Sequence, residues 1–339
     1  MKKFIIATLL FLMPFYIPIL TYVVFDPFMV VWKYDSFYNM NNKVWIDLDK
    51  DYVSTTTFDK QYKEEGYNSF IFGSSRSIFY EISDWKKHIG KSSKCYHFDA
   101  SDESLYGLGK KIKYINDKGL KIENALLIFD YNLLVQDKPR KDHLYAISPQ
   151  LENKSNAASF HLEFLKAFLS FPFLYEYIDY KFSGRAKPYM KTIISKKYDD
   201  KHNEYDLKTN EIRFRAAEEL ISEGKYYTDE KMKEFYKRDS LQTYSDVAIK
   251  ENSKKMLKEI FEIFNTHGTN YKIIISPKYD QLKINEEDLS YLIKLFGEKN
   301  VFNFSGKNNM TDDYKNYYDP NHYRSHIARE VMSIIYKNE

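Results

Sequence analysis

The chain has 339 residues, with 51 lysines and arginines, 48 aspartates and glutamates, and a formal net charge of +3. These charges are mixed along the sequence without a basic block, so nucleic-acid binding has no electrostatic support. The single cysteine, Cys95, excludes an intramolecular disulfide and any multi-cysteine metal site. The length suits one α/β domain with an insertion, and we expect no cofactor.

The amino terminus indicates a membrane protein. Lys2 and Lys3 precede an uncharged run, Phe4 to Phe25, which would be about 33 Å long as a helix and could cross a bilayer. Bulky residues follow the run in place of a small-residue cleavage site, so we expect an uncleaved transmembrane anchor over residues 1–25 and not a signal peptide. With the lysines at one end and Asp26 at the other, the amino terminus is expected in the cytoplasm and the rest of the chain outside.

Beyond the anchor we expect a stalk and one globular domain. Residues 26–66 mix aromatic and charged residues without a clear period and are expected to form the stalk. Residues 67–339 are expected to form the α/β domain. Short apolar runs in this domain predict five strands, at Ser69–Gly73, Tyr96–Ala100, Ala125–Phe129, Tyr271–Ile275 and Val301–Phe304.

Helical patterns separate these strands, at Lys110–Lys118, Ile249–Phe264, Leu289–Phe296 and Pro320–Tyr336. Strands joined by helices pair in parallel, because parallel neighbours need crossover connections. We therefore predict a three-layer α/β sandwich with a five-stranded parallel sheet. Residues 133–243 are too long for one crossover and contain helical pieces at Phe160–Phe171 and Ile212–Ser222. They are expected to form a helical insertion, or lid, over the carboxyl edge of the sheet.

The first predicted strand runs directly into Gly73, Ser74, Ser75 and Arg76. In open parallel sheets, ligands bind beyond the carboxyl ends of the strands, so a serine at this point is presented to a ligand. Gly73 permits a tight backbone path, and a helix after the turn would direct free N–H groups toward an anion near Ser75. Taken alone, the turn also fits a capping serine in an ordinary β–α loop.

Asp319, Pro320, Asn321 and His322 form the second motif, near the carboxyl terminus. We expect Asp319 to be the N-cap of the last helix and Pro320 to occupy its first position. A serine hydroxyl is a poor nucleophile until a base takes its proton, and histidine does this best when a carboxylate orients the ring. In the alternative interpretation, Asp319 only caps the helix and His322 faces solvent.

Together these motifs resemble those of the SGNH hydrolase superfamily, also called the GDSL family. That family has a Gly-Asp-Ser turn after its first strand and an Asp-x-x-His motif near its carboxyl terminus. The matching segments here are Gly73–Ser75 and Asp319–His322. The resemblance implies a flavodoxin-like fold and assigns the nucleophile, base and acid to Ser75, His322 and Asp319. The Gly-Ser-Ser-Arg form and the anchor are similar to extracytoplasmic members that serve polysaccharide or teichoic-acid acylation.

The resemblance is weaker in the middle of the chain. Family members usually have a glycine after strand two and Gly-x-Asn-Asp after strand three, which complete the oxyanion hole. This chain has Asp99–Ser104 and Phe129–Asn132 at those places. Ser101 and Asn132 are therefore the oxyanion candidates, and a non-catalytic member stays open.

Two further side chains have alternative interpretations. Arg76 could orient a carboxylate or phosphate of the substrate, or pair with a structural acid. His322 and His326 are four residues apart and could share a metal on one helical face. The glutamate of a His-Glu-x-x-His motif is absent, however, and no third ligand is indicated, so we expect no metal.

The sequence thus predicts a serine-dependent esterase or O-acyltransferase that works through an acyl-enzyme on a cell-surface glycan. The resemblance also implies a possible partner, a multi-span membrane O-acyltransferase that delivers the acyl group. The alternative is a non-catalytic glycan-binding or scaffold subunit of an envelope-polysaccharide biosynthesis complex. Its contact surface would be the aromatic-rich insertion.

Overall fold

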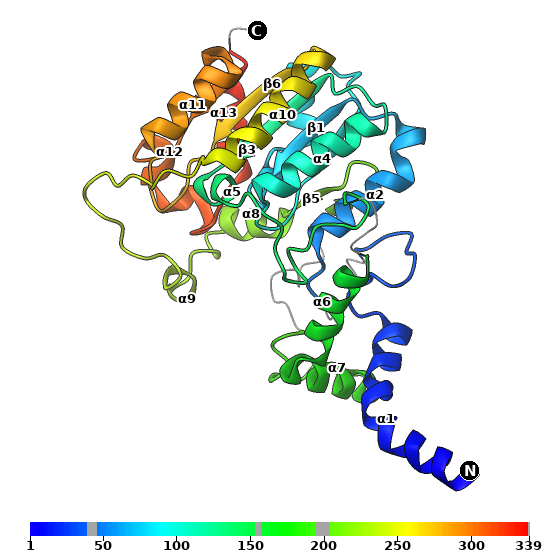
Figure 1. The fold of residues 1–339 in the computed structure, drawn as a ribbon. Helices are drawn as coiled ribbons and strands as arrows, with labels where there is room; N and C mark the ends of the chain where they lie inside the picture. Colours follow the sequence, from blue (N-terminus) through cyan, green and yellow to red (C-terminus); the bar gives the residue numbers. More distant parts are fainter. Residues whose placement is uncertain (39–45, 153–156, 194–203, 338–339) are drawn as a thin grey trace.

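A five-stranded sheet forms the centre of the molecule (Figure 1). The computed structural model describes residues 1–38, 46–152, 157–193 and 204–337. All neighbouring strands of the sheet are parallel, in the order β2-β1-β3-β6-β7. The strands are β1 (Ser69–Gly73), β2 (Cys95–His97), β3 (Asn124–Phe129), β6 (Asn270–Ile275) and β7 (Val301–Asn303). The mixed α/β class and the parallel sheet predicted from the sequence are confirmed.

Helices cover both faces of this sheet, because alternate residues of its buried strands point to opposite sides. Phe70 and Phe72 of β1 belong to one hydrophobic cluster, and Ile71 belongs to the other. The first cluster includes side chains from α2 (Lys50–Glu65), α4 (Leu105–Asp117), α10 (Glu251–His267) and α11 (Glu286–Phe296). The second includes side chains from α3 (Ile82–Ile89) and α13 (Ser325–Ile335).

Local signals explain several helix ends. The Ser104 hydroxyl accepts a hydrogen bond from the Gly107 N–H at 2.9 Å, so α4 begins before the predicted Lys110. Gly268 has φ +64° and ends α10, as its position after the apolar period predicts. The last helix, α13, begins at Ser325 and not at Pro320.

The expected stalk is wrong for residues 50–65. These residues form helix α2, whose Phe58 is fully buried in the core beside the sheet. The side chain of Asp49 caps this helix by accepting hydrogen bonds from the N–H groups of Asp51 and Tyr52. The sequence did not predict this helix, because polar and aromatic residues are mixed in it without a clear apolar face. Several polar residues of α2 are buried together with the apolar ones.

Helix α1 (Lys2–Phe25) occupies the expected anchor segment and projects from the rest of the molecule (Figure 1). Within the described residues, no single helix is long and apolar enough to cross a membrane. The pair Lys2–Met13 and Tyr16–Phe25, bent by 61°, meets the length and composition of a broken span. Asp26 follows, and its buried carboxylate accepts hydrogen bonds from the N–H groups of Val30, Val31 and Trp32.

The predicted insertion contains two regions with different neighbours. Its described elements are α5 (Tyr131–Val135), α6 (Ala157–Leu169), α7 (Phe171–Ser183), β4 (Glu204–Asp206), β5 (Glu211–Arg213), α8 (Arg215–Ser222) and α9 (Asp229–Met232). Helices α6 and α7 pack against α1 and not over the sheet (Figure 1). The segment at β5 runs along strand β2, where the Thr209 carbonyl accepts a hydrogen bond from the His97 N–H at 2.9 Å.

Short elements complete the chain. The 3-10 helices among the described residues are η1 (Ser77–Phe79), η3 (Glu298–Asn300) and η4 (Tyr314–Asn316). Helix α12 (Asn309–Asp312) precedes an antiparallel pair, β8 (Tyr317–Asp319) and β9 (His322–Tyr323).

Candidate active site

Strand β1 delivers Ser75 to the carboxyl edge of the sheet. Gly73, its last residue, lies against strand β3, and a Cβ added there would stand 2.9 Å from the Ile128 carbonyl oxygen. Only glycine fits this close approach. The turn that follows is fixed because both the N–H and the hydroxyl of Ser77 donate to the Ser74 carbonyl, at 2.8 and 2.7 Å.

A hairpin, and not a helix start, positions Asp319 and His322. The expectation that Asp319 caps the last helix is wrong, because Asp319 ends β8 and His322 begins β9. The two residues are cross-strand partners, with the turn between them. Tyr317 and Tyr323 pair beside them and are buried, and this burial favours the hairpin over a helix.

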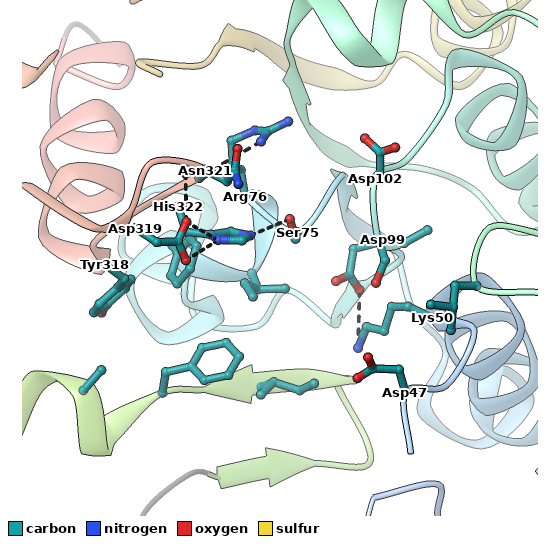
Figure 2. Close-up of a pocket in the computed structure, with 18 of the residues that line it drawn as sticks. Asp47, Lys50, Ser75, Arg76, Asp99, Asp102, Tyr318, Asp319, Asn321 and His322 are labelled. Atoms are coloured by element: carbon teal, nitrogen blue, oxygen red, sulfur yellow. Dashed lines mark hydrogen bonds and ion pairs between the residues drawn. The ribbon is translucent and has the colours of Figure 1, made fainter. Parts of the chain in front are cut away.

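The three predicted catalytic side chains meet in one hydrogen-bonded chain (Figure 2). The Ser75 Oγ lies 2.8 Å from the His322 Nε2, and the His322 Nδ1 lies 2.9 Å from both carboxylate oxygens of Asp319. The carboxylate favours a proton on Nδ1, which leaves the Nε2 lone pair to accept the serine proton. This is the arrangement of a nucleophile, a general base and an orienting acid.

Arg76 connects the turn after β1 to neighbouring parts of the site through hydrogen bonds. Its guanidinium donates hydrogen bonds to the Asp130 carboxylate, with Nε at 3.1 Å from Oδ2, and to the Asn321 carbonyl at 3.3 Å. Burial alone would raise the pKa of Asp130, but the positive charges of Arg76 and Lys278, together with the hydrogen bonds that Asp130 accepts, hold that pKa below its usual value. Since Arg76 is itself buried, these contacts favour its structural role and join β1, β3 and the hairpin.

Ser75 opens into a cavity of about 660 Å³. The six residues that the sequence singles out all line it: Ser75, Arg76, Ser101, Asn132, Asp319 and His322. The roles of Ser101 and Asn132 in binding an oxyanion stay predictions. A cavity of this volume can hold a small molecule or the end of an oligomer.

The cavity has walls of different chemistry. Phe79 belongs to the wall beside the catalytic chain, since its ring centroid lies 6.0 Å from that of His322 and 6.2 Å from that of Phe214. Ile78, Ile212, Ala217 and Leu220 also line the cavity. Across the pocket, Figure 2 shows a polar group of Asp47, Lys50 and Asp99. The cavity thus has apolar surface near the nucleophile and charged surface opposite it.

The metal and cysteine interpretations find no support in the geometry. His322 lies in β9 and His326 in α13, so the two do not share one helical face, and His326 Nε2 lies 3.0 Å from the Asn316 side-chain oxygen. The described residues hold no group of three or more side chains suited to a metal ion. Burial raises the pKa of Cys95 to about 12, so its thiol stays protonated at neutral pH.

Sequence reasoning missed the residues that come from the expected stalk and from the insertion. Asp47 and Lys50 precede or begin α2, and Phe214 and Tyr226 come from the insertion, yet all four line the cavity. No motif marks them. For Asp47 and Lys50, one signal could have been used: Asp49 is a typical capping residue, and it indicates that a helix begins at Lys50.

No protein-family model matches the chain, and no curated protein matches it significantly.

Proposed function

We propose that this protein is a serine-dependent esterase or O-acyltransferase that acts on a cell-surface glycan outside the membrane. The observation that carries the proposal is the continuous hydrogen-bonded chain from Ser75 through His322 to Asp319. The resemblance of both motifs to the SGNH superfamily supports the same reaction class.

The reaction proceeds in two acyl-transfer steps. In the first, the Ser75 Oγ attacks the carbonyl carbon of an ester while the His322 Nε2 takes the hydroxyl proton, and the alcohol leaves with that proton. In the second, water or a sugar hydroxyl gives its proton to His322 and attacks the acyl-enzyme, which restores Ser75. Asp319 holds the ring and stabilises its positive charge in both steps.

Exposed apolar side chains support the membrane location. Phe11 of α1 is 75% exposed, and Phe171 and Phe182 of the neighbouring helix α7 are 80% and 89% exposed. Large exposed apolar side chains on two neighbouring helices are costly in water and typical of a membrane or protein interface. We place α1 in the bilayer as a bent anchor, with the catalytic domain on the extracytoplasmic side. A multi-span acyltransferase is the proposed acyl donor, on the resemblance alone.

A fluorophosphonate probe tests the proposal. The full-length protein in detergent should be labelled covalently, and Ser75→Ala should abolish labelling. Ser74→Ala is the matched control, because Ser74 is the next residue in the chain, does not line the cavity, and has a buried hydroxyl with no hydrogen-bond partner among the described residues, so it should label normally.

An unlabelled wild-type protein with a normal melting transition would overturn the catalytic proposal. The non-catalytic glycan-binding or scaffold role would then be the better reading of the same cavity.

A further inference from the structure

The wall of the cavity opposite Ser75 contains two buried charged groups with unused hydrogen-bonding capacity. Lys50 and Asp99 are 6% and 1% exposed. Within the part of the chain that the structure describes, the Lys50 Nζ has no hydrogen-bond partner, and the same holds for the Asp99 Oδ2. The nearest contact between them, from Nζ to the Asp99 Oδ1, is 3.8 Å and too long for a hydrogen bond.

Burying such charged groups without hydrogen-bond partners lowers the stability of the folded protein. An ammonium carries three donors and a carboxylate accepts at two oxygens, and each unsatisfied buried group costs stability. Asp99 is partly satisfied, since its Oδ1 accepts a hydrogen bond from the Asn210 side chain at 3.3 Å. Both residues line the cavity that contains Ser75.

The surrounding charges decide what kind of ligand fits. Figure 2 places Lys50 between Asp47 and Asp99, so the ammonium already has carboxylates beside it. An anionic ligand that approached the ammonium would be repelled by these carboxylates. A hydroxyl group avoids the repulsion, because it accepts a hydrogen bond from the ammonium and donates one to the carboxylate. Two neighbouring hydroxyls of a sugar ring would satisfy both residues together.

We propose that Lys50 and Asp99 form a hydroxyl-binding subsite that holds an uncharged sugar ring, the alcohol half of the ester whose carbonyl Ser75 attacks. The ring of Tyr38, whose centroid lies 5.4 Å from the Lys50 Nζ, lines the same cavity and adds aromatic surface beside the subsite. The acyl group then lies on the apolar side, near Phe79. This inference rests on the proposed acyl-transfer function and names its substrate class.

Lys50→Met tests the subsite, because it keeps the length and apolar stem of the side chain and removes only the ammonium. Lys231→Met is the matched control, since Lys231 also lines the cavity but pairs with Glu234 at 2.8 Å. Hydrolysis of 4-nitrophenyl acetate, which has no sugar, is compared with hydrolysis of acetylated methyl glucoside, galactoside and N-acetylglucosaminide. We expect Lys50→Met to raise KM for at least one sugar ester about tenfold to a hundredfold, as for a lost charged hydrogen bond. The aryl ester should react as in the wild type.

A binding measurement separates this proposal from the catalytic one. Saturation-transfer NMR would follow the three unesterified methyl glycosides on Ser75→Ala, alone and combined with Lys50→Met or with Asp99→Asn. If Ser75→Ala binds a glycoside, and adding either Lys50→Met or Asp99→Asn removes that binding, the subsite is supported. This holds even if the wild type shows no esterase activity or probe labelling.

Three results would overturn the subsite. These are no binding of any of the three glycosides at millimolar concentrations, binding that Lys50→Met leaves unchanged, and preferential binding of galacturonate or glycerol phosphate. A thermal melt of each variant shows whether the fold is kept, and Asp99→Asn provides the second route if Lys50→Met unfolds.

Discussion

At the scale of single residues, His322 has a defined role because both of its ring nitrogens are occupied. Its Nδ1 faces the Asp319 carboxylate and its Nε2 faces the Ser75 hydroxyl. A neutral imidazole can be donor at one nitrogen and acceptor at the other, so the carboxylate selects the tautomer that can act as a base toward Ser75.

Replacing Asp319 by asparagine should therefore impair catalysis far more than folding. The amide can donate a hydrogen bond to Nδ1, which would favour the tautomer with its proton on Nε2, facing Ser75. We expect kcat for 4-nitrophenyl acetate to fall by about 10⁴-fold, as in triads that lose their aspartate. Asp313→Asn is the matched control, because Asp313 caps η4 near the same hairpin but does not line the cavity. An Asp319→Asn enzyme with near wild-type kcat would remove Asp319 from the mechanism.

Sequence motifs identified the catalytic candidates but not the residues that surround them. Ser75, Asp319 and His322 could be proposed because each of the two motifs is recognised from a few neighbouring residues, although Ser75 and His322 are 247 positions apart. The pairing of Arg76 with Asp130 joins residues 54 positions apart, and the burial of Lys50 depends on where α2 packs. Neither follows from the residues next to them in the chain.

At the scale of secondary-structure elements, strands were predicted better than the polar helix and the hairpin. Strands β1 and β3 are mostly apolar runs that are buried on both faces, and β6 ends in three consecutive buried isoleucines, which is a local property of the sequence. The hairpin at β8 and β9 was mistaken for a helix start, since Asp-Pro is a helix-start signal. Tertiary contacts override that signal, because Tyr318 and Arg324 both donate hydrogen bonds to Glu218 of α8.

A buried ionic group links α2 to α4. The Lys111 ammonium, at the centre of α4, lies 3.0 Å from the Asp51 carboxylate of α2 and also bonds Glu103. Burial, opposed by Lys111, raises the pKa of Glu103 to about 7. Glu103 would ionise near its ordinary pKa in the unfolded chain. Between the two values the folded protein binds the extra proton, so the free energy of unfolding falls as pH rises through this window.

Replacing Glu103 by glutamine should flatten this dependence. From about pH 5 to about pH 8, we expect the free energy of unfolding of the wild type to fall relative to that of Glu103→Gln by on the order of 2 kcal/mol. Guanidinium unfolding of the full chain in detergent, followed by the fluorescence of the buried Trp85, measures this. Glu223→Gln, at an exposed ion pair, should keep the wild-type slope. Equal slopes for wild type and Glu103→Gln would show that Glu103 does not titrate in this range.

At the scale of the whole molecule, the cavity lies where four parts of the chain meet. The sheet supplies the nucleophile, and the hairpin of β8 and β9 supplies Asp319 and His322. The segment before and at the start of α2 supplies Asp47 and Lys50, and the insertion supplies Phe214 and Tyr226. The order of the sheet follows from its strands and crossovers, which the sequence indicates. The path of the insertion does not, because its contacts along β2 and against α1 have no periodic pattern.

The packing of α7 on α1 predicts which surface faces the bilayer. The ring of Tyr177 contacts that of Phe25 at a centroid distance of 6.4 Å, and the Lys181 Nζ lies 5.0 Å from the same ring centroid. If α1 is inserted in a bilayer, α7 lies against the membrane surface and its exposed Phe182 enters the apolar region.

A fluorescent label at this position tests the orientation. Cys95 is buried with a raised pKa, so a cysteine introduced by Phe182→Cys can be labelled selectively. In phospholipid vesicles, an environment-sensitive dye there should shift to the blue and be quenched by brominated acyl chains. The same dye at Lys299→Cys, an exposed position in η3 directly before strand β7 and so at the amino edge of the sheet, should report water. If the dye emission at both positions is typical of water while the protein is still bound to the vesicles, α7 faces solvent. Its exposed aromatic side chains would then be available to a protein partner.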